Sequence, residues 1–197
     1  MTARLTFLRT PSNVGGIAGL TIELPLQATQ TVFNERRWLE LLADRDLARI
    51  EGRVETDRHG RVIMTPPPSA RHGALQSEIA YLLRTRISSG RVLTECPIST
   101  ADGIRAADVA WASAHSVREL GARVCFPRAP EICVEVLSPS NTQAEVREKT
   151  ALDFDAGAHE VWLCADSGEM TFLQAGEEAR ISASRIVSLF QSTIVLS

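Results

Sequence analysis

Two carboxylates interrupt segments that otherwise have the composition of buried β-strands. Glu135 stands in the apolar run 131–137 (EICVEVL), and Asp108 stands in the run 106–113 (AADVAWAS). Because strand side chains alternate between the two faces of a sheet, Asp108 shares its face with small alanines, which leave room for a ligand or a water molecule. An unpaired, ionised carboxylate costs several kcal/mol when it is buried, so each acid requires a cation, a proton or strong hydrogen-bond donors.

Two acids at core-strand positions predict a divalent cation held between neighbouring strands. Oxygen ligands of this kind suit Mg²⁺ or Mn²⁺, which are bound by few carboxylates and keep several water molecules. The alternative is an acid at a strand end that pairs with an arginine, for which Arg105 is close to Asp108. The spacing leaves both interpretations open.

Lys149 is the only lysine among the 21 lysine and arginine residues of the chain. It lies on the predicted helix that directly follows the Glu135 strand. Its compact charge suits a water nucleophile, a phosphate oxygen or a nearby carboxylate. The alternative is a surface ion pair with Glu145 in the favourable i,i+4 order, worth ~0.3 kcal/mol, with Asp153 continuing the same charged stripe.

His72 is the remaining side chain with catalytic potential. It lies near the start of a predicted helix at helical spacing from Leu75 and Ile79. A lone histidine at such a position is more often a hydrogen-bonded core residue, although histidine also recurs at functional sites. Glu51, just before Gly52, is interpreted as part of a turn or a strand end.

The N-terminal half of the chain reads as helices around one hairpin. Residues 19–26 (GLTIELPL) are a possible strand, and a helix is predicted over 31–44 with Asn34 as its N-cap and Phe33 as a staple residue. Residues 47–65 predict a strand, a turn near 59–60 and a returning strand. The next helix is predicted to begin at the cap Ser69 and to end at Gly90.

The C-terminal half is dominated by strands. Four apolar runs, at 91–98, 106–113, 131–137 and 159–166, alternate with a short helix at 115–121 and a longer one at 141–157, and the tail after 168 looks like additional strands. This alternation predicts an α/β fold with a mixed central β-sheet flanked by helices. We expect one domain over 1–197, in which residues 1–30 form an N-terminal arm or an edge strand.

Composition narrows the class of protein. A chain of 197 residues with 44% hydrophobic and 23% charged residues is ordinary for one globular domain, and no apolar run reaches the roughly 20 residues of a membrane span. The N-terminus lacks the apolar core of a signal peptide, so a cytoplasmic protein is expected. The four cysteines form no CxxC pair, which argues against a cysteine-based zinc site. A net charge of −3 argues mildly against a high-affinity DNA binder, but not against an enzyme that meets phosphates in one local groove.

Two segments resemble a known family. Residues 129–166, with "EVLSPS" followed by a helix that carries a lysine, resemble the core of the Uma-type putative restriction endonucleases, a bacterial branch of the PD-(D/E)XK nuclease superfamily. Residues 50–83 are similar to the opening segment of that family. The resemblance implies a restriction-endonuclease-like fold and Mg²⁺- or Mn²⁺-dependent hydrolysis of DNA phosphodiester bonds.

The resemblance also implies roles for individual residues. Asp108 falls at the aspartate of the Pro-Asp motif and Glu135 at the glutamate of the third motif, so these two would be the metal ligands. Leu137 stands at the usual lysine position, and Lys149 takes that role from the following helix. His72 falls at a recurrent histidine that supports the site or contacts substrate. Glu78 is a candidate for an additional helix-borne acid, although an exposed helix glutamate is the preferred interpretation.

The chain departs from the family pattern at five positions, none of which is a proposed ligand. They are Ala107 for proline, Glu145 for aspartate, Asp153 for tyrosine, Ala158 for valine and Val161 for tyrosine. The leading hypothesis is therefore a metal-dependent endonuclease that contacts DNA locally, as a possible homodimer. The alternatives are a nuclease-fold binding or assembly module without catalytic activity, and a hydrolase that uses His72 with a nearby acid and is insensitive to chelators.

Overall fold

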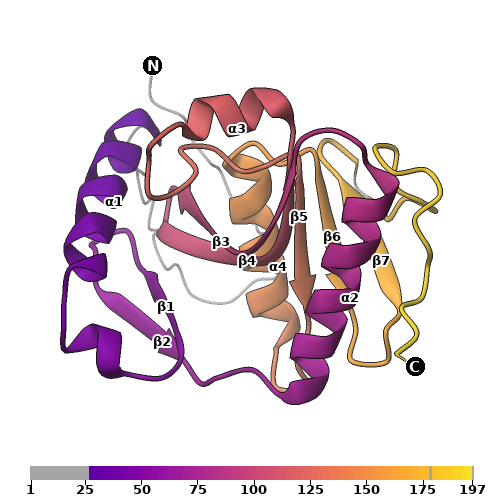
Figure 1. The fold of residues 1–197 in the computed structure, drawn as a ribbon, viewed down its shortest axis with the longest axis horizontal. Coiled ribbons are helices and arrows are strands. Elements are labelled where there is room, and N and C mark those ends of the chain that lie inside the picture. Colours follow the sequence, from indigo (N-terminus) through magenta and orange to yellow (C-terminus); the bar gives the residue numbers. More distant parts are fainter. Residues whose placement is uncertain (1–26, 178, 197) are drawn as a thin grey trace, which may run out of the picture.

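A five-stranded mixed sheet forms the centre of the computed structural model, which describes residues 27–177 and 179–196 (Figure 1). The strand order is β3-β4-β5-β6-β7, with β5 parallel to β6 and the other neighbours antiparallel. The sheet confirms the predicted α/β class. Its strands are β3 (Arg91–Thr100), β4 (Gly103–Ala112), β5 (Ile132–Val136), β6 (Glu160–Cys164) and β7 (Met170–Gln174).

Helices cover both faces of this sheet. On one face, α2 (Ala70–Arg86) packs against β3, β4 and β5, and the C-terminal tail joins the same hydrophobic core. On the other face lie α3 (Ala114–Leu120) and α4 (Gln143–Asp155), and α4 is the crossover that parallel strands β5 and β6 require. Because β5 is buried on both sides, its sequence is an apolar run in which a carboxylate is conspicuous.

The predicted hairpin forms a separate two-stranded sheet. Among the residues that the structure describes, strands β1 (Arg53–Thr56) and β2 (Val62–Thr65) pair only with each other. Helix α1 (Gln27–Leu42) packs close by through Trp38 and Leu41. The hairpin rests on the turn between β3 and β4, where Ile104 N donates to Thr56 Oγ1 at 2.9 Å. A Cβ on Gly103, which has φ +95°, would lie 2.2 Å from Thr56 O, so the contact requires glycine.

Several predicted element ends need correction. Asn34 is not an N-cap, because α1 begins at Gln27 and Asn34 is buried within it, donating to Ser99 Oγ (2.9 Å) and Thr100 O (3.0 Å). Phe33 is likewise a mid-helix residue. Ser69 is confirmed as a cap by its bond from His72 N, but α2 ends at Arg86, and Gly90 shapes the turn into β3 instead.

The described part of the C-terminal tail contains less regular structure than predicted. Among the described residues of the tail, β7 is the one regular strand, and two isolated bridges join Phe172 to Ile181 and Glu169 to Thr193. The possible strand at 19–26 lies outside the described residues. Within residues 27–177 and 179–196, no helix is both long and apolar enough to cross a membrane. A short 3₁₀ turn (Leu47–Arg49) joins α1 to the hairpin.

Candidate active site

The central strands separate where the two carboxylates stand. The ladder between β4 and β5 ends at the pair Val109 and Val134, so the next pair in register would be Asp108 and Glu135. Val136 N instead donates to Asp108 Oδ2 at 2.6 Å. The carboxylate therefore takes the hydrogen bond that a neighbouring strand carbonyl would otherwise accept, and the two strands part at this point.

The ladder on the other side of β4 is interrupted at the same place. Thr94 and Cys96 of β3 pair with Val109 and Ala107, but Glu95 between them has φ +50°. Among the described residues it is the only non-glycine residue with a positive φ. Such a conformation costs roughly 1–2 kcal/mol, and strain of this kind concentrates at functional sites.

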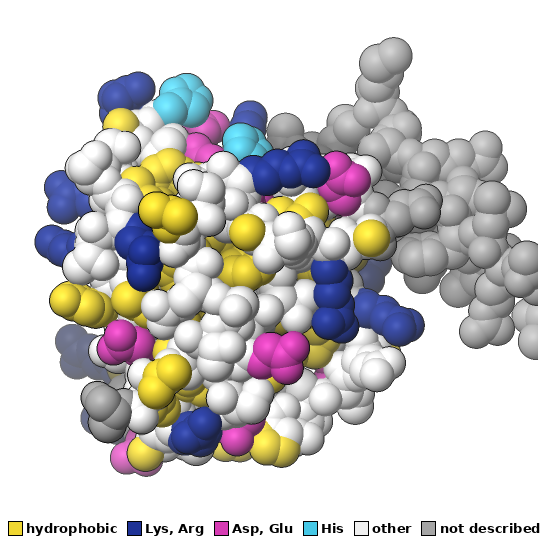
Figure 2. Space-filling model, turned by 90° about the vertical axis from the view of Figure 1, so that its right-hand side faces the viewer, with side chains coloured by type: hydrophobic (Ala, Val, Ile, Leu, Met, Phe, Trp, Pro, Cys, Tyr) yellow, Lys and Arg dark blue, Asp and Glu magenta, His cyan; other side chains and the backbone are white. Residues whose placement is uncertain are grey.

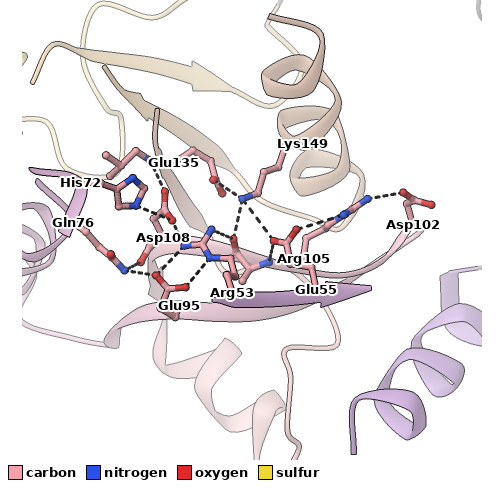
Figure 3. A network of polar contacts seen from close by, with 12 residues as sticks. Arg53, Glu55, His72, Gln76, Glu95, Asp102, Arg105, Asp108, Glu135 and Lys149 are labelled. Atoms are coloured by element: carbon pink, nitrogen blue, oxygen red, sulfur yellow. Dashed lines mark hydrogen bonds and ion pairs between the residues drawn. The ribbon is translucent and has the colours of Figure 1, made fainter. Parts of the chain in front are cut away.

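Lys149 reaches into this gap from α4 (Figure 3). Its Nζ lies 2.6 Å from Glu135 Oε2, 3.0 Å from Ala106 O and 3.9 Å from Glu55 Oε1. Glu145 does not pair with it. The Glu145 carboxylate accepts from Thr142 N in a capping box at the start of α4, so the interpretation of a surface ion pair between Glu145 and Lys149 is wrong.

Burial and charge together set the ionisation of these groups. Burial raises the pKa of Glu135, and the Lys149 ammonium opposes that effect. Burial alone would lower the pKa of Lys149, but the carboxylates of Glu135 and Glu55 outweigh it and raise that pKa above its ordinary value. Burial also favours a higher pKa for Asp108, yet His72 and the guanidinium of Arg53 lower it to about 2. Lys149 is therefore protonated at neutral pH.

Asp108 does pair with an arginine, but not with Arg105. Its partner is Arg53 of β1, whose Nη2 contacts Asp108 Oδ1. Arg53 also forms two bonds of 2.8 Å to the Glu95 carboxylate. Arg105 lies farther along the same network, 2.7 Å from Asp102 and 3.4 Å from Glu55.

The face of α2 that carries His72 and Gln76 closes one side of the site. Gln76 Nε2 donates to Glu95 Oε1 and to Asp108 O, both at 2.8 Å. His72 Nε2 lies 3.4 Å from Asp108 Oδ1, and its side chain is 15% exposed. The structure brings His72 to the carboxylates, whereas Glu78, on the same helix, is not among the described residues that line the cleft.

The gap opens into a cleft of about 610 Å³. His72, Asp108, Glu135 and Lys149 all line it, and two loops, 65–69 and 137–141, form its walls. The lining residues are Arg53, Glu55, Thr65, Pro66, Pro67, Pro68, Ser69, His72, Arg105, Asp108, Glu135, Val136, Leu137, Ser138, Pro139, Ser140, Asn141, Glu145, Val146, Glu148, Lys149, Leu152 and Asp166.

The carboxylates fit a hard divalent cation. Glu135 Oε1 is buried and has no hydrogen-bond partner among the described residues, so one oxygen of the pair is free to bind a ligand. The described residues contain no cluster of three or more histidine, cysteine or acidic side chains arranged around a metal position. Asp108 and Glu135 thus offer two carboxylates, a small number of protein ligands that suits cations that keep much of their water.

Five polar residues of the site were not identified from the sequence. Arg53, Gln76 and Glu95 had no distinguishing spacing. Asp153 was interpreted as part of an exposed charged stripe, which is wrong because its side chain is buried. Glu51 was considered in the hairpin, where Glu55 is the acid that reaches the site. A signal existed for Glu55, since it alternates with Val54 in a strand and so faces the opposite side from it. The contact between Arg53 and Glu95 depends on pairing between distant segments, which the local sequence does not indicate.

Asp153 provides a test of the electrostatics that is independent of activity. It is buried behind Lys149, its Oδ2 has no partner among the described residues, and burial raises its pKa to about 7. The folded protein therefore holds a proton that the unfolded chain releases above its ordinary pKa of 3.8, so this group's contribution to stability is lost as the pH rises toward 7. In Asp153→Asn this loss should disappear.

Urea unfolding in chelator at several pH values measures the effect. Relative to wild type, Asp153→Asn should gain about 3 kcal/mol in unfolding free energy between about pH 4 and about pH 8. Asp155→Asn, an exposed change on the same helix, is the matched control and should leave the pH dependence as in wild type. Parallel pH curves for wild type and Asp153→Asn would show that Asp153 is ionised at neutral pH.

Comparison with known proteins agrees with this geometry. A family model described as Uma2, "Putative restriction endonuclease", matches residues 41–194. A crystal structure described as a putative nuclease belonging to DUF820 from Anabaena variabilis ATCC 29413 aligns with a TM-score of 0.61 at 19% identity, covering 75% of this chain and 92% of that chain. No curated protein sequence matches the chain. The structural likeness confirms the restriction-endonuclease-like fold predicted from the sequence.

Proposed function

Because the chain belongs to the Uma2 family of putative restriction endonucleases, we propose that it is a metal-dependent endonuclease that hydrolyses DNA phosphodiester bonds. Its catalytic residues would be Asp108, Glu135 and Lys149. The observation that carries the proposal is the contact of 2.6 Å between Lys149 Nζ and Glu135 Oε2 beside the buried Asp108, with Glu135 Oε1 unbonded. Apolar residues of similar size would stabilise the fold at least as well as a buried ion pair, so the pair is better explained by a function than by stability.

Each residue has a role that its contacts support. Asp108 and Glu135 would hold Mg²⁺ or Mn²⁺, which when bound polarises a phosphate oxygen and lowers the pKa of a water molecule. Lys149 would offset the negative charge that develops on the phosphate. The raised pKa of Lys149 argues against its acting as the base that deprotonates the water. His72, next to Asp108, would contact the substrate or orient that carboxylate.

Charge distribution supports a local contact with DNA. Figure 2 shows the side of the molecule that carries β7 and the C-terminal tail, where basic and acidic side chains of the described residues are scattered among apolar and neutral ones. The described residues on this side therefore form no concentrated basic surface for nucleic acid. Because each chain has one such set of catalytic groups, cutting both strands at one position favours a homodimer.

Plasmid nicking tests the proposal. Wild-type protein should convert supercoiled plasmid to the nicked form with added Mg²⁺ or Mn²⁺, lose this activity in EDTA and regain it when the cation is returned in excess. Asp108→Ala, purified identically, should be inactive, which excludes a contaminating nuclease. Activity that persists in EDTA would favour a hydrolase based on His72, whereas failure both to bind Mn²⁺ and to nick would favour a binding or assembly module.

A further inference from the structure

A cation of the protein's own already contacts one of the proposed metal ligands. The Arg53 guanidinium touches Asp108 Oδ1, and Asp108 has a side chain only 2% exposed. Val136 N and His72 also lie close to that carboxylate. A carboxylate buried to this degree requires a partner charge, so Arg53 stabilises Asp108 in the absence of any added cation.

Arg53 is also held from its other side. The Glu95 carboxylate accepts hydrogen bonds from Arg53 Nε and Nη2, each at 2.8 Å, in the forked geometry that gives arginine–carboxylate pairs their strength. Gln76 fixes Glu95 in turn by donating to its Oε1. The strained backbone of Glu95, at φ +50°, turns this residue out of the regular pairing of β3 with β4. Arg53 thus has an anchor that does not depend on Asp108.

The cleft as a whole is too acidic to attract a phosphate unaided. Its lining contains six carboxylates against three basic side chains, with His72 not counted. The carboxylates are Glu55, Asp108, Glu135, Glu145, Glu148 and Asp166, and the basic residues are Arg53, Arg105 and Lys149. Two of these three basic groups, Arg53 and Lys149, contact the proposed ligands directly. Arg53 or Lys149 therefore becomes free to contact an anionic substrate only when a bound cation neutralises the carboxylate that it now contacts.

We propose that Arg53 changes partners during substrate binding, a proposal that rests on the proposed function. Without a divalent cation, Arg53 neutralises Asp108. When Asp108 binds a divalent cation, Arg53 keeps its two bonds to Glu95, through Nε and one hydrogen of Nη2. The other Nη2 hydrogen, which Asp108 then releases, donates to a backbone phosphate of the DNA in the cleft. Arginine suits this second partner because its planar fork matches phosphate oxygens. Arg53 is then a substrate-positioning residue, and Glu95 is the anchor that keeps it within reach.

Two affinities that move in opposite directions test this exchange. Removing the charge in Arg53→Gln should tighten Mn²⁺ binding, measured by isothermal titration calorimetry without DNA, on the order of tenfold, because a competing cation is gone. The same variant should bind a labelled duplex oligonucleotide on the order of tenfold more weakly in Ca²⁺, measured by fluorescence anisotropy, because a phosphate contact is lost. A residue that only supports the hairpin would not tighten Mn²⁺ binding.

A second arginine substitution controls for the general effect of removing one positive charge on Mn²⁺ affinity. Arg71 contacts Asp166 at the cleft and neither Asp108 nor Glu135, so Arg71→Gln should leave Mn²⁺ affinity within a few-fold of wild type. Mn²⁺ binding that is unchanged or weaker in folded Arg53→Gln would overturn the proposal. So would DNA binding in Ca²⁺ that matches wild type.

A second pair of variants applies even where Arg53→Gln does not fold. Glu95 is half-exposed, at 48%, and Glu95→Gln weakens the anchor so that Arg53 remains on Asp108. Mn²⁺ and DNA should then both bind more weakly than in Glu148→Gln, which removes a cleft carboxylate that does not contact Arg53. Equal affinities in the two variants would overturn the anchor role. Plasmid nicking by wild type is scored separately, so loss of the exchange and loss of nuclease activity remain distinct results.

Discussion

Replacing Lys149 with methionine is expected to slow DNA nicking by about 10²–10³-fold, the usual consequence of removing one charged group that faces a developing negative charge. Methionine preserves the length and apolar stem of the side chain while it removes the ammonium that lies 2.6 Å from Glu135. The measurement is the initial rate of supercoiled plasmid conversion in Mn²⁺, at enzyme concentrations at which wild type completes the reaction.

The same helix supplies the control for that experiment. Arg147 is exposed on α4, two residues before Lys149, and Arg147→Met removes an equal charge without touching the carboxylates. Its nicking rate should stay within a few-fold of wild type. Equal slowing in both variants would assign the effect to general attraction of DNA, and an unchanged rate in Lys149→Met would remove this lysine from the mechanism.

Lys149→Met should also destabilise the protein, by about 3 kcal/mol in chelator near pH 8, because it leaves a buried carboxylate without its partner charge. Glu135→Gln combined with Lys149→Met should recover most of that loss, since it removes the unpaired charge as well. Urea unfolding of the wild type, both single variants and the double variant forms a cycle from which the coupling is obtained.

The sign of the pH effect provides a check within the same experiment. In Lys149→Met, burial raises the pKa of Glu135 with no ammonium to oppose it. The folded state then retains a proton that the unfolded chain releases, so the stability of this variant falls as the pH rises above the ordinary glutamate pKa of 4.5. The deficit should therefore be smaller near about pH 5 than near about pH 8. A double variant no more stable than Lys149→Met would show that the pair is not coupled.

The elements around the site were predictable because each has a local signature. Residues close together in the chain specify the apolar runs of β3 to β6, the cap at Ser69 and the crossover helix α4. Asp108 and Glu135 were detectable for the same reason, because a carboxylate in a strand covered on both faces contradicts its surroundings. The spacing left the role of Lys149 open between a contact at the site and a surface ion pair with Glu145, and the family resemblance favoured the contact at the site.

The supporting network was not predictable, because its partners lie far apart in sequence. Arg53 and Glu95 are separated by 42 positions, and neither stands out within its own segment. Asn34 was misassigned as a cap because its local pattern favours one, whereas its amide is satisfied by the strand end at Ser99 and Thr100. Tertiary hydrogen bonds of this kind override local preference and leave no periodic trace.

The position of the hairpin depends on a residue that carries no reactive group. Gly103 does not line the cleft, yet Arg53 and Glu55 reach the carboxylates only while β1 can approach the backbone of that turn. Any larger residue there would separate the hairpin from the sheet, and with it Arg53 and Glu55 from the site, although every ionisable residue remains in the sequence. Inventories of essential positions that consider only ionisable side chains would overlook it, and a chain that retains all of them can still be inert.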